Sequence, residues 1–146
     1  VYNSPVNKFV ASFIGAPPMN FLEGKIIKKD SMLYFDEGNF RVRLVEAVYD
    51  SLEDYINERV ILGVRSEDIY DKLFVSEAPP ENIVTMTCEV VEHLGSEVYI
   101  HMNTGKHVLV ARVAGDANPQ INQDMDLAFD MSKVHFFDKA TEKTIV

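Results

Sequence analysis

The chain has 146 residues, of which 47% are hydrophobic and 25% charged, a length and balance typical of one compact globular domain and unlike a disordered chain. Its formal net charge of −9 disfavours binding to the phosphate backbone of nucleic acids. The single cysteine, Cys88, excludes an internal disulfide, and no apolar run approaches the roughly 20 residues that a membrane-spanning helix needs. The first residues lack the pattern of a signal peptide, so a cytoplasmic location is expected.

The N-terminal segment predicts a short amphipathic helix with an abrupt end. Ser4 and Pro5 supply a capping hydroxyl and a first-turn proline. Gly15 suits the position just past a helix end, and Pro17 with Pro18 prevents its continuation. The apolar residues at helical spacing are Val6, Phe9, Val10, Phe13 and Ile14.

Alternating apolar and polar residues then predict strands. Phe21 to Lys28 is read as one strand, and Met32 to Phe35 as the first arm of a hairpin. The second arm contains Phe40, Val42 and Leu44, after the turn sequence Asp36-Glu37-Gly38-Asn39.

Residues 48 to 58 have few apolar side chains and predict a connector. Their acidic residues, from 50 to 58, form either a solvated face or a docking patch for a basic partner. The apolar run Arg59 to Arg65 predicts a strand buried on both faces. Ser66 is expected to cap a helical turn that has Glu67 and Asp68 as first-turn acids.

A surface loop from Val75 to Asn82, with Pro79-Pro80 inside it, is expected to separate two halves of the domain. Residues 19–45 and 84–113 share the order strand, turn, hairpin, which indicates a weak duplication. Around nine short strands with little helix predict an all-β barrel or sandwich. The strands expected in the second half are centred on Val84 to Val90, Val98 to Met102, Val108 to Val110, Met125 to Phe129, Val134 to Phe137 and Thr144 to Val146.

The sequence contains no recognisable catalytic motif. Gly105-Lys106 resembles the end of a phosphate-binding loop, but His107 and Ile100 occupy the positions that require Ser or Thr and a glycine. We therefore predict no catalytic residues, no cofactor and no metal site. If the hairpin loop has three residues, His101 and His107 face one another, and such a pair is able to hold a metal, although strand histidines are more often structural.

Four separated motifs resemble one known family. They are VASFIGAPPMNFLEG at 10–24, GVRSEDI at 63–69, VEHLGSE at 91–97 and HFFD at 135–138. In this order and spacing they are similar to the C-terminal domain of the sugar-importer ATPases, the maltose and multiple-sugar class of ABC transporter subunits, over nearly the whole chain. The family commonly has proline where this chain has Ser66. The motif residues that we carry forward are Phe9, Val10, Phe13, Ile14, Gly15, Pro17, Met19, Asn20, Phe21, Gly63, Arg65, Glu67, Asp68, Leu94, Gly95, Phe137 and Asp138.

The resemblance implies a mainly all-β, OB-type or MOP-like barrel with a short N-terminal linking helix. Residues 1–18 would be the linking helix from a nucleotide-binding domain, and residues 19–146 the regulatory OB-type or TOBE domain. Such a domain tethers and modulates paired ATPase domains without hydrolysing ATP itself. The implied partners are a second copy, the nucleotide-binding domain, the permease subunits indirectly and, in some relatives, a regulatory protein, all at the cytoplasmic face of the membrane.

Two other functions remain open from the residues alone. A module that binds a small oxyanion or another small ligand would use donors such as Ser96, Thr104 and Lys106. An OB-type nucleic-acid binder would stack bases on aromatic rings, which the negative charge disfavours. The rings available for stacking are Tyr34, Phe35, Phe40 and Tyr99.

Overall fold

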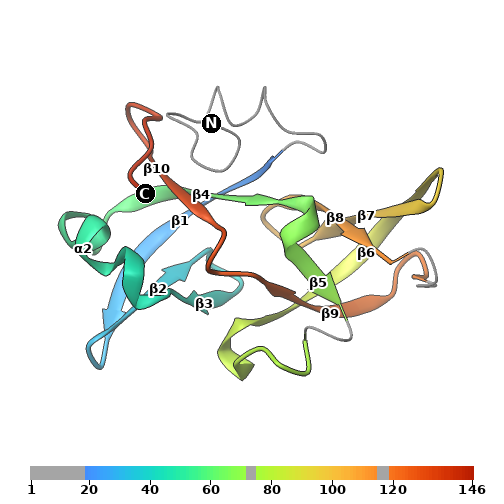
Figure 1. Cartoon of the computed structure of the whole chain (residues 1–146), viewed down its shortest axis with the longest axis horizontal. Coiled ribbons are helices and arrows are strands. Elements are labelled where there is room, and N and C mark those ends of the chain that lie inside the picture. The colour runs from blue at the N-terminus through green and yellow to red at the C-terminus, as the bar shows by residue number, and fades with distance from the viewer. Residues whose placement is uncertain (1–18, 72–74, 115–118) are drawn as a thin grey trace.

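The computed structural model describes residues 19–71, 75–114 and 119–146, and within them the chain forms two five-stranded antiparallel sheets (Figure 1). The all-β prediction is therefore confirmed. The predicted helix at residues 4–14 lies outside the described residues.

The first sheet has the strand order β10-β4-β1-β2-β3. The long strand β1 pairs with β2 over Lys25 to Lys29 and with β4 over Met19 to Lys25, so its two halves serve two neighbours. The strands of this sheet are β1 (Met19–Lys29), β2 (Met32–Asp36), β3 (Arg41–Arg43), β4 (Arg59–Arg65) and β10 (His135–Asp138).

The second sheet has the strand order β5-β9-β6-β7-β8 and repeats the plan of the first. Its long strand β6 pairs with β9 at its beginning and with β7 along the rest, with a bulge between Cys88 and Val90. The strands are β5 (Ile69–Asp71), β6 (Ile83–Leu94), β7 (Glu97–Asn103), β8 (Val108–Val113) and β9 (Asp124–Phe129). The predicted duplication is thus present in the topology.

The two halves of the chain exchange their last strands. The strands β1 to β5 form the first half, yet β5 pairs with β9 in the second sheet. The strands β6 to β10 form the second half, yet β10 pairs with β4 in the first sheet. Figure 1 shows both crossings, with the green chain running from β4 to β5 and the red chain from β9 to β10. Each sheet is therefore incomplete without the other half.

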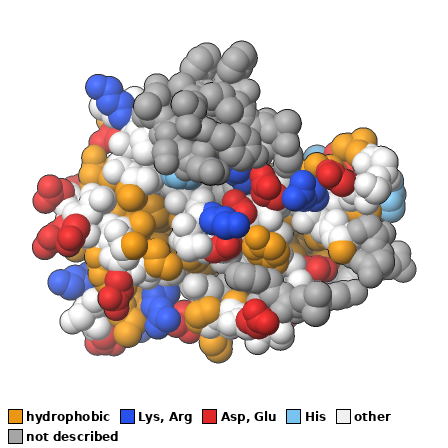
Figure 2. All heavy atoms as spheres, in the orientation of Figure 1, with side chains coloured by type: hydrophobic (Ala, Val, Ile, Leu, Met, Phe, Trp, Pro, Cys, Tyr) orange, Lys and Arg blue, Asp and Glu red, His pale blue; other side chains and the backbone are white. Residues whose placement is uncertain are grey.

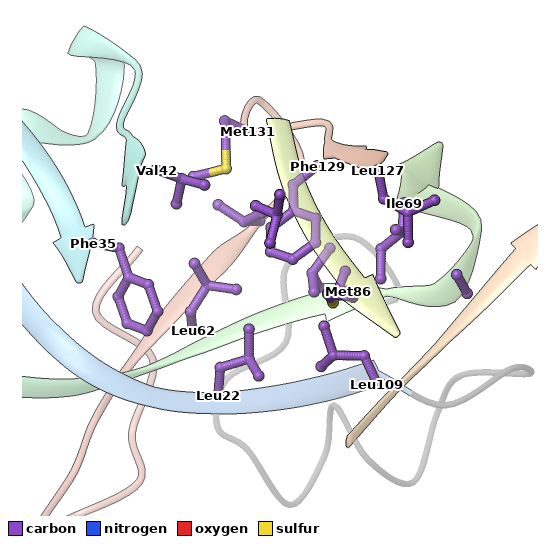
Figure 3. Close-up of a cluster of buried hydrophobic side chains, with 14 of the residues drawn as sticks. Leu22, Phe35, Val42, Leu62, Ile69, Met86, Leu109, Leu127, Phe129 and Met131 are labelled. Carbon is purple, nitrogen blue, oxygen red and sulfur yellow. The ribbon is translucent and has the colours of Figure 1, made fainter. Parts of the chain in front are cut away.

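One hydrophobic core lies between the sheets, and alternate residues of the strands contribute their side chains to it. Leu22 of β1, Leu62 of β4, Met86 of β6 and Phe129 of β9 are all at most 2% exposed and belong to one cluster. Figure 3 shows these side chains converging from both sheets. Because such burial contributes roughly 25 cal/mol per Å² of apolar surface, the shared core binds the halves into one unit.

The connector between β3 and β4 contains helical turns. They are the short 3₁₀ helices η1 (Glu46–Val48) and η2 (Glu53–Tyr55), on either side of α2 (Tyr49–Leu52). Leu52 is fully buried and anchors the segment. Asp50, Glu53, Asp54 and Glu58 are exposed, and Figure 2 shows acidic side chains along the edge where Figure 1 places α2.

Two asparagines cap the edge strands of opposite sheets. Asn20 Oδ1 accepts a hydrogen bond from the Val110 N–H of β8 at 2.9 Å. Asn82, just before β6, accepts one from the Arg43 N–H of β3 at 2.7 Å. They occupy equivalent places in a repeat that our sequence analysis missed, Ala16-Pro17-Pro18-Met19-Asn20 against Ala78-Pro79-Pro80-Glu81-Asn82. Most of the predicted surface loop at residues 75–82 is exposed, and only its last residue, Asn82, is buried.

Other departures from the predicted elements are local. The three-residue strand β5 was not predicted, because its partner comes from the other half of the chain. A 3₁₀ turn, η4 (Pro80–Asn82), precedes β6. At the C-terminal end, Thr144 forms an isolated bridge with Phe137 instead of a strand. Within the described ranges, none of the helices has the length and apolar character needed to span a bilayer.

Candidate functional site

Three of the four sequence motifs meet on the outer face of the first sheet, away from the main core. Phe21 of β1 pairs with Gly63 of β4, and Gly63 pairs in turn with His135 of β10. Alternate residues of these strands face outward and form a second hydrophobic cluster, which we call the outer cluster. It consists of Met19, Phe21, Ile61 and Phe137, packed around Gly63.

The outer cluster is tightly packed. The rings of Phe21 and Phe137 meet edge to face, with centroids 5.8 Å apart, and Phe137 is fully buried. A Cβ atom at Gly63 would overlap Met19 Sδ and lie 2.9 Å from Phe137 Cε2. Gly63 is therefore required by close packing and not by a turn.

A polar pocket of about 370 Å³ adjoins the point where β4 crosses to the second sheet. Arg65 and Asp68 line it and are both buried, and Lys133 Nζ lies 3.9 Å from Asp68 Oδ1. Burial raises the pKa of Asp68 above its usual value, and the nearby Lys133 only partly opposes this. The other residues of the pocket are Glu67, Ser132, Val134 and His135. Figure 2 shows side chains of both charges close together in the middle of the molecule.

The predicted cap at Ser66 is wrong. The 3₁₀ turn η3 (Ser66–Asp68) follows β4 directly, so the capping position belongs to Arg65 in extended backbone, and no side chain caps the turn. Ser66 Oγ is buried without a hydrogen bond to any residue in the described part of the chain. Asp68 faces Lys133, and Glu67 Oε2 lies 3.8 Å from the guanidinium of Arg112, so both acids make ion pairs with other elements.

Asp138 organises the turn after β10. Its Oδ1 accepts hydrogen bonds from the N–H groups of Ala140 and Thr141, each at 2.9 Å. Its Oδ2 accepts one from the Tyr55 hydroxyl at 3.0 Å. The Thr141 N–H and the Tyr55 hydroxyl hold the pKa of Asp138 below its usual value. This motif residue therefore joins β10 to the segment that carries α2.

The remaining motif residues are not part of this assembly. Leu94 and Gly95 lie at the tip of the β6–β7 hairpin, where Gly95 has a φ of +65° and Leu94 is 57% exposed. Figure 1 shows that tip far from β10 and β4. The other six lie outside the described residues: Phe9, Val10, Phe13, Ile14, Gly15 and Pro17.

A contact between two hairpin turns was missed by our sequence analysis. Glu37, between β2 and β3, is fully buried and accepts hydrogen bonds from Thr104 Oγ1 at 2.5 Å and His107 Nδ1 at 2.7 Å. His107 Nε2 accepts the Glu23 N–H at 3.2 Å, which assigns the ring proton to Nδ1. Burial raises the pKa of Glu37, but the bonds from His107, Thr104 and the Asn39 N–H outweigh it, so the pKa lies below its usual value.

The predicted pairing of His101 with His107 is wrong. His101 faces Val110 across the hairpin, because the strands end at Asn103 and resume at Val108 and leave a four-residue turn. His101 instead contacts Glu92. In the described ranges, no group of three or more His, Cys, Asp or Glu is arranged to hold a metal ion.

The proposed oxyanion donors do not converge. Ser96 lies in the β6–β7 turn, while Thr104 and Lys106 lie in the β7–β8 turn. The Thr104 hydroxyl already donates to the Glu37 carboxylate, whose charge would repel an anion. Phe35, one of the rings considered for base stacking, is fully buried. These residues therefore pack and bond within the fold, and they do not form a site for an oxyanion or a nucleic-acid base.

Comparison with known proteins gives two adjacent domain matches. The family model of the MalK OB fold domain matches residues 15–69, and that of the TOBE domain matches residues 78–136. Each match ends inside the exchanged strand of its half. The first ends at the first residue of β5, and the second ends within β10.

Two curated relatives are similar over almost the whole chain. The trehalose/maltose import ATP-binding protein MalK of Thermococcus litoralis is 40% identical over 148 residues, which cover 99% of this chain and 39% of that protein. The oligosaccharides import ATP-binding protein MsmX of Bacillus subtilis is 37% identical over 147 residues, again covering 99% and 39%. The chain therefore spans about two fifths of the length of these relatives.

A solved structure supports the fold. The cytoplasmic molybdate-binding protein ModG, with molybdate bound, superposes with a TM-score of 0.60 and covers 80% of this chain and 94% of its own. The two share 14% sequence identity, so the likeness concerns the arrangement of strands alone.

Proposed function

We propose a regulatory and dimerising role for this chain because it belongs to the MalK OB fold and TOBE domains of sugar-import ATP-binding proteins. Two copies would meet and hold a pair of ATPase domains together while these open and close. Such a tether acts by raising the effective concentration of one ATPase domain near the other. The observation that carries this proposal is the sequence likeness over 99% of the chain to sugar-import ATP-binding proteins.

The outer cluster supports the proposed division of the chain. Residues 1–18 would link residues 19–146 to a nucleotide-binding domain, and they join the described part at Met19, itself a member of the outer cluster. The permease subunits would then be indirect partners at the inner face of the membrane.

The regulatory part of the role requires a partner that binds the open and closed states with different affinity. The polar pocket beside Arg65 and Asp68 suits a protein surface with charges of both signs, because it combines buried acidic and basic groups. The chain would transmit this bias to ATPase domains without hydrolysing ATP itself.

Sedimentation of the purified chain over a wide concentration range tests the dimerising role. The expected result is a mass that rises from 16.6 kDa toward twice that value as concentration increases. A strict monomer at the highest concentration would contradict it. Hydrolysis of ATP by the purified chain alone would contradict the accessory role.

A further inference from the structure

The two asparagine caps are equivalent in position but differ in their hydrogen bonds. Asn20 Nδ2 donates to the Val110 carbonyl at 2.9 Å and to the Val64 carbonyl at 3.2 Å, so its amide joins β8 to β4. Asn82 makes the corresponding bond through Oδ1, to the Arg43 N–H. Its Nδ2 has no hydrogen bond to any residue that the structure describes. The second cap is therefore half open.

A pocket of about 480 Å³ lies where the second cap is open, a size within the usual range for small-ligand sites. Asn82 lines it and is only 7% exposed, so its free amide hydrogens are held at the wall of the pocket. The bond to the Arg43 N–H fixes which end of the amide is the donor. The buried polar atoms without a partner in the described part of the chain do not include Asn82 Nδ2, so this donor is open to the pocket and accessible to an acceptor on a ligand.

The floor of this pocket is apolar. Phe129 and Met131 reach it from the end of β9, and Figure 3 shows Met131 extending toward Val42 of β3. Leu44, Val45 and Tyr49 also line it. This surface suits the C–H face of a ring-shaped ligand.

The polar part of the lining is rich in acceptors. Glu46, Glu77 and Asp130 contribute three carboxylates, of which Asp130 already accepts hydrogen bonds from Ser132 and lies 3.9 Å from Lys133 Nζ. The guanidinium of Arg43 is paired with Glu81 at 2.9 Å. An anion would face these carboxylates with no free cation among the pocket-lining residues to offset them. An ammonium ligand would leave the Asn82 donor unsatisfied, because it has no acceptor. Hydroxyl groups both donate and accept.

We propose that this pocket binds a neutral carbohydrate of one or two sugar rings. The Asn82 amide donates to a ligand hydroxyl oxygen, the carboxylates accept from ligand hydroxyls, and the ring lies on Phe129 and Met131. The bound sugar thereby bridges β3 and β9, as the Asn20 amide bridges β8 and β4. This ligand site goes beyond the proposed dimerising role and does not depend on it.

Titration calorimetry of the whole chain with glucose, maltose and trehalose, each to tens of millimolar, tests the proposal. We expect saturable binding of at least one sugar. Asn82→Asp keeps the acceptor for the Arg43 N–H but removes the donor, and Ala78→Phe fills the pocket from its rim. Each should weaken binding at least tenfold, whereas Asn122→Asp, the same change on an exposed turn outside the pocket, should leave it unchanged.

The outcomes test the location of the site and the class of its ligand separately. Sugar binding that survives both substitutions would overturn the site. No saturable binding of any of the three sugars would overturn the proposal, and saturation by molybdate or spermidine in their place would overturn the ligand class. Circular dichroism of each variant checks that it is folded. Sedimentation reports self-association separately, so either proposal can fail without the other.

Discussion

Gly63 is the residue on which the packing of the outer cluster depends. We expect Gly63→Ala to destabilise the fold by about 1–3 kcal/mol, because the new methyl group would overlap Met19 and crowd Phe137. Combined with Met19→Ala, part of this loss should be recovered, since the methyl group then has space. Urea denaturation of the single and double variants measures both effects.

Gly95 provides the matched control for this prediction. No atom lies within 4 Å of a Cβ built there, so Gly95→Ala costs only the strain of a positive φ, roughly 1–2 kcal/mol. The losses of stability caused by Gly95→Ala and Met19→Ala should add, because Gly95 and Met19 are distant from each other. A Gly63→Ala variant as stable as the parent would disprove the packing role of Gly63.

Glu37 gives the fold a specific sensitivity to acid. Its pKa is lower in the folded chain than its usual value, so its stabilising effect is full above that usual value and is lost as pH falls through the folded pKa. We expect Glu37→Gln to cost about 1–3 kcal/mol at pH 7. The difference from the parent should shrink in urea denaturation at pH 3, while Glu53→Gln, an exposed control, should change little at either pH. A difference that stays constant with pH would contradict this role.

The sequence indicated residues of the outer cluster but not what they do. Met19, Phe21, Gly63 and Phe137 were recognised through motifs far apart in the chain, and only the pairing of β1, β4 and β10 shows that they touch. The contact of Glu37 with His107 joins two turns 70 residues apart and leaves no local pattern. Residue types predict chemistry, whereas contacts of this kind depend on the register of the sheets.

At the level of elements, the two edge strands differ in how firmly they are held. The side chain of Asn20 makes three hydrogen bonds with the described residues, and the side chain of Asn82 makes one. At about 1 kcal/mol per bond, Asn20→Ala should cost ~3 kcal/mol and Asn82→Ala ~1 kcal/mol. Amide exchange should accelerate at Val110 in the first variant and at Arg43 in the second. Equal losses of stability, measured in urea, would show that the second cap is closed in solution.

Elements with a strong local pattern were predicted well. Arg59 to Arg65 was predicted with the bounds of β4, because an uninterrupted apolar run is typical of a strand buried on both faces. The short strand β5 has no such pattern and owes its conformation to β9. The four-residue β7–β8 turn also departs from prediction, since the Thr104 hydroxyl accepts the N–H groups of Lys106 and His107 and extends the loop.

For the whole molecule, the exchange of β5 and β10 predicts a single unfolding transition, although two domain families match the chain. Ile69→Ala in β5 and Phe136→Ala in β10 remove fully buried side chains and should each cost about 2–5 kcal/mol. Each variant should lower the midpoint of the unfolding transition by the same amount in the two sheets. NMR signals from residues of each sheet measure the two midpoints. Val108→Ala, on an exposed position of β8, should leave the midpoint nearly unchanged. Separate midpoints for the two sheets would contradict this coupling.

The position of β10 beside β4 also bears on synthesis of the protein. A ribosome releases β4 before β5 to β9, yet the strand that covers one of its edges, β10, is the last described strand to emerge. Until then that edge offers unpaired backbone groups to any other extended polypeptide nearby. Nascent chains are thus vulnerable to association and to chaperone capture while the residues between Arg65 and His135 are being added, and a chain cut short before His135 keeps that vulnerability for its lifetime.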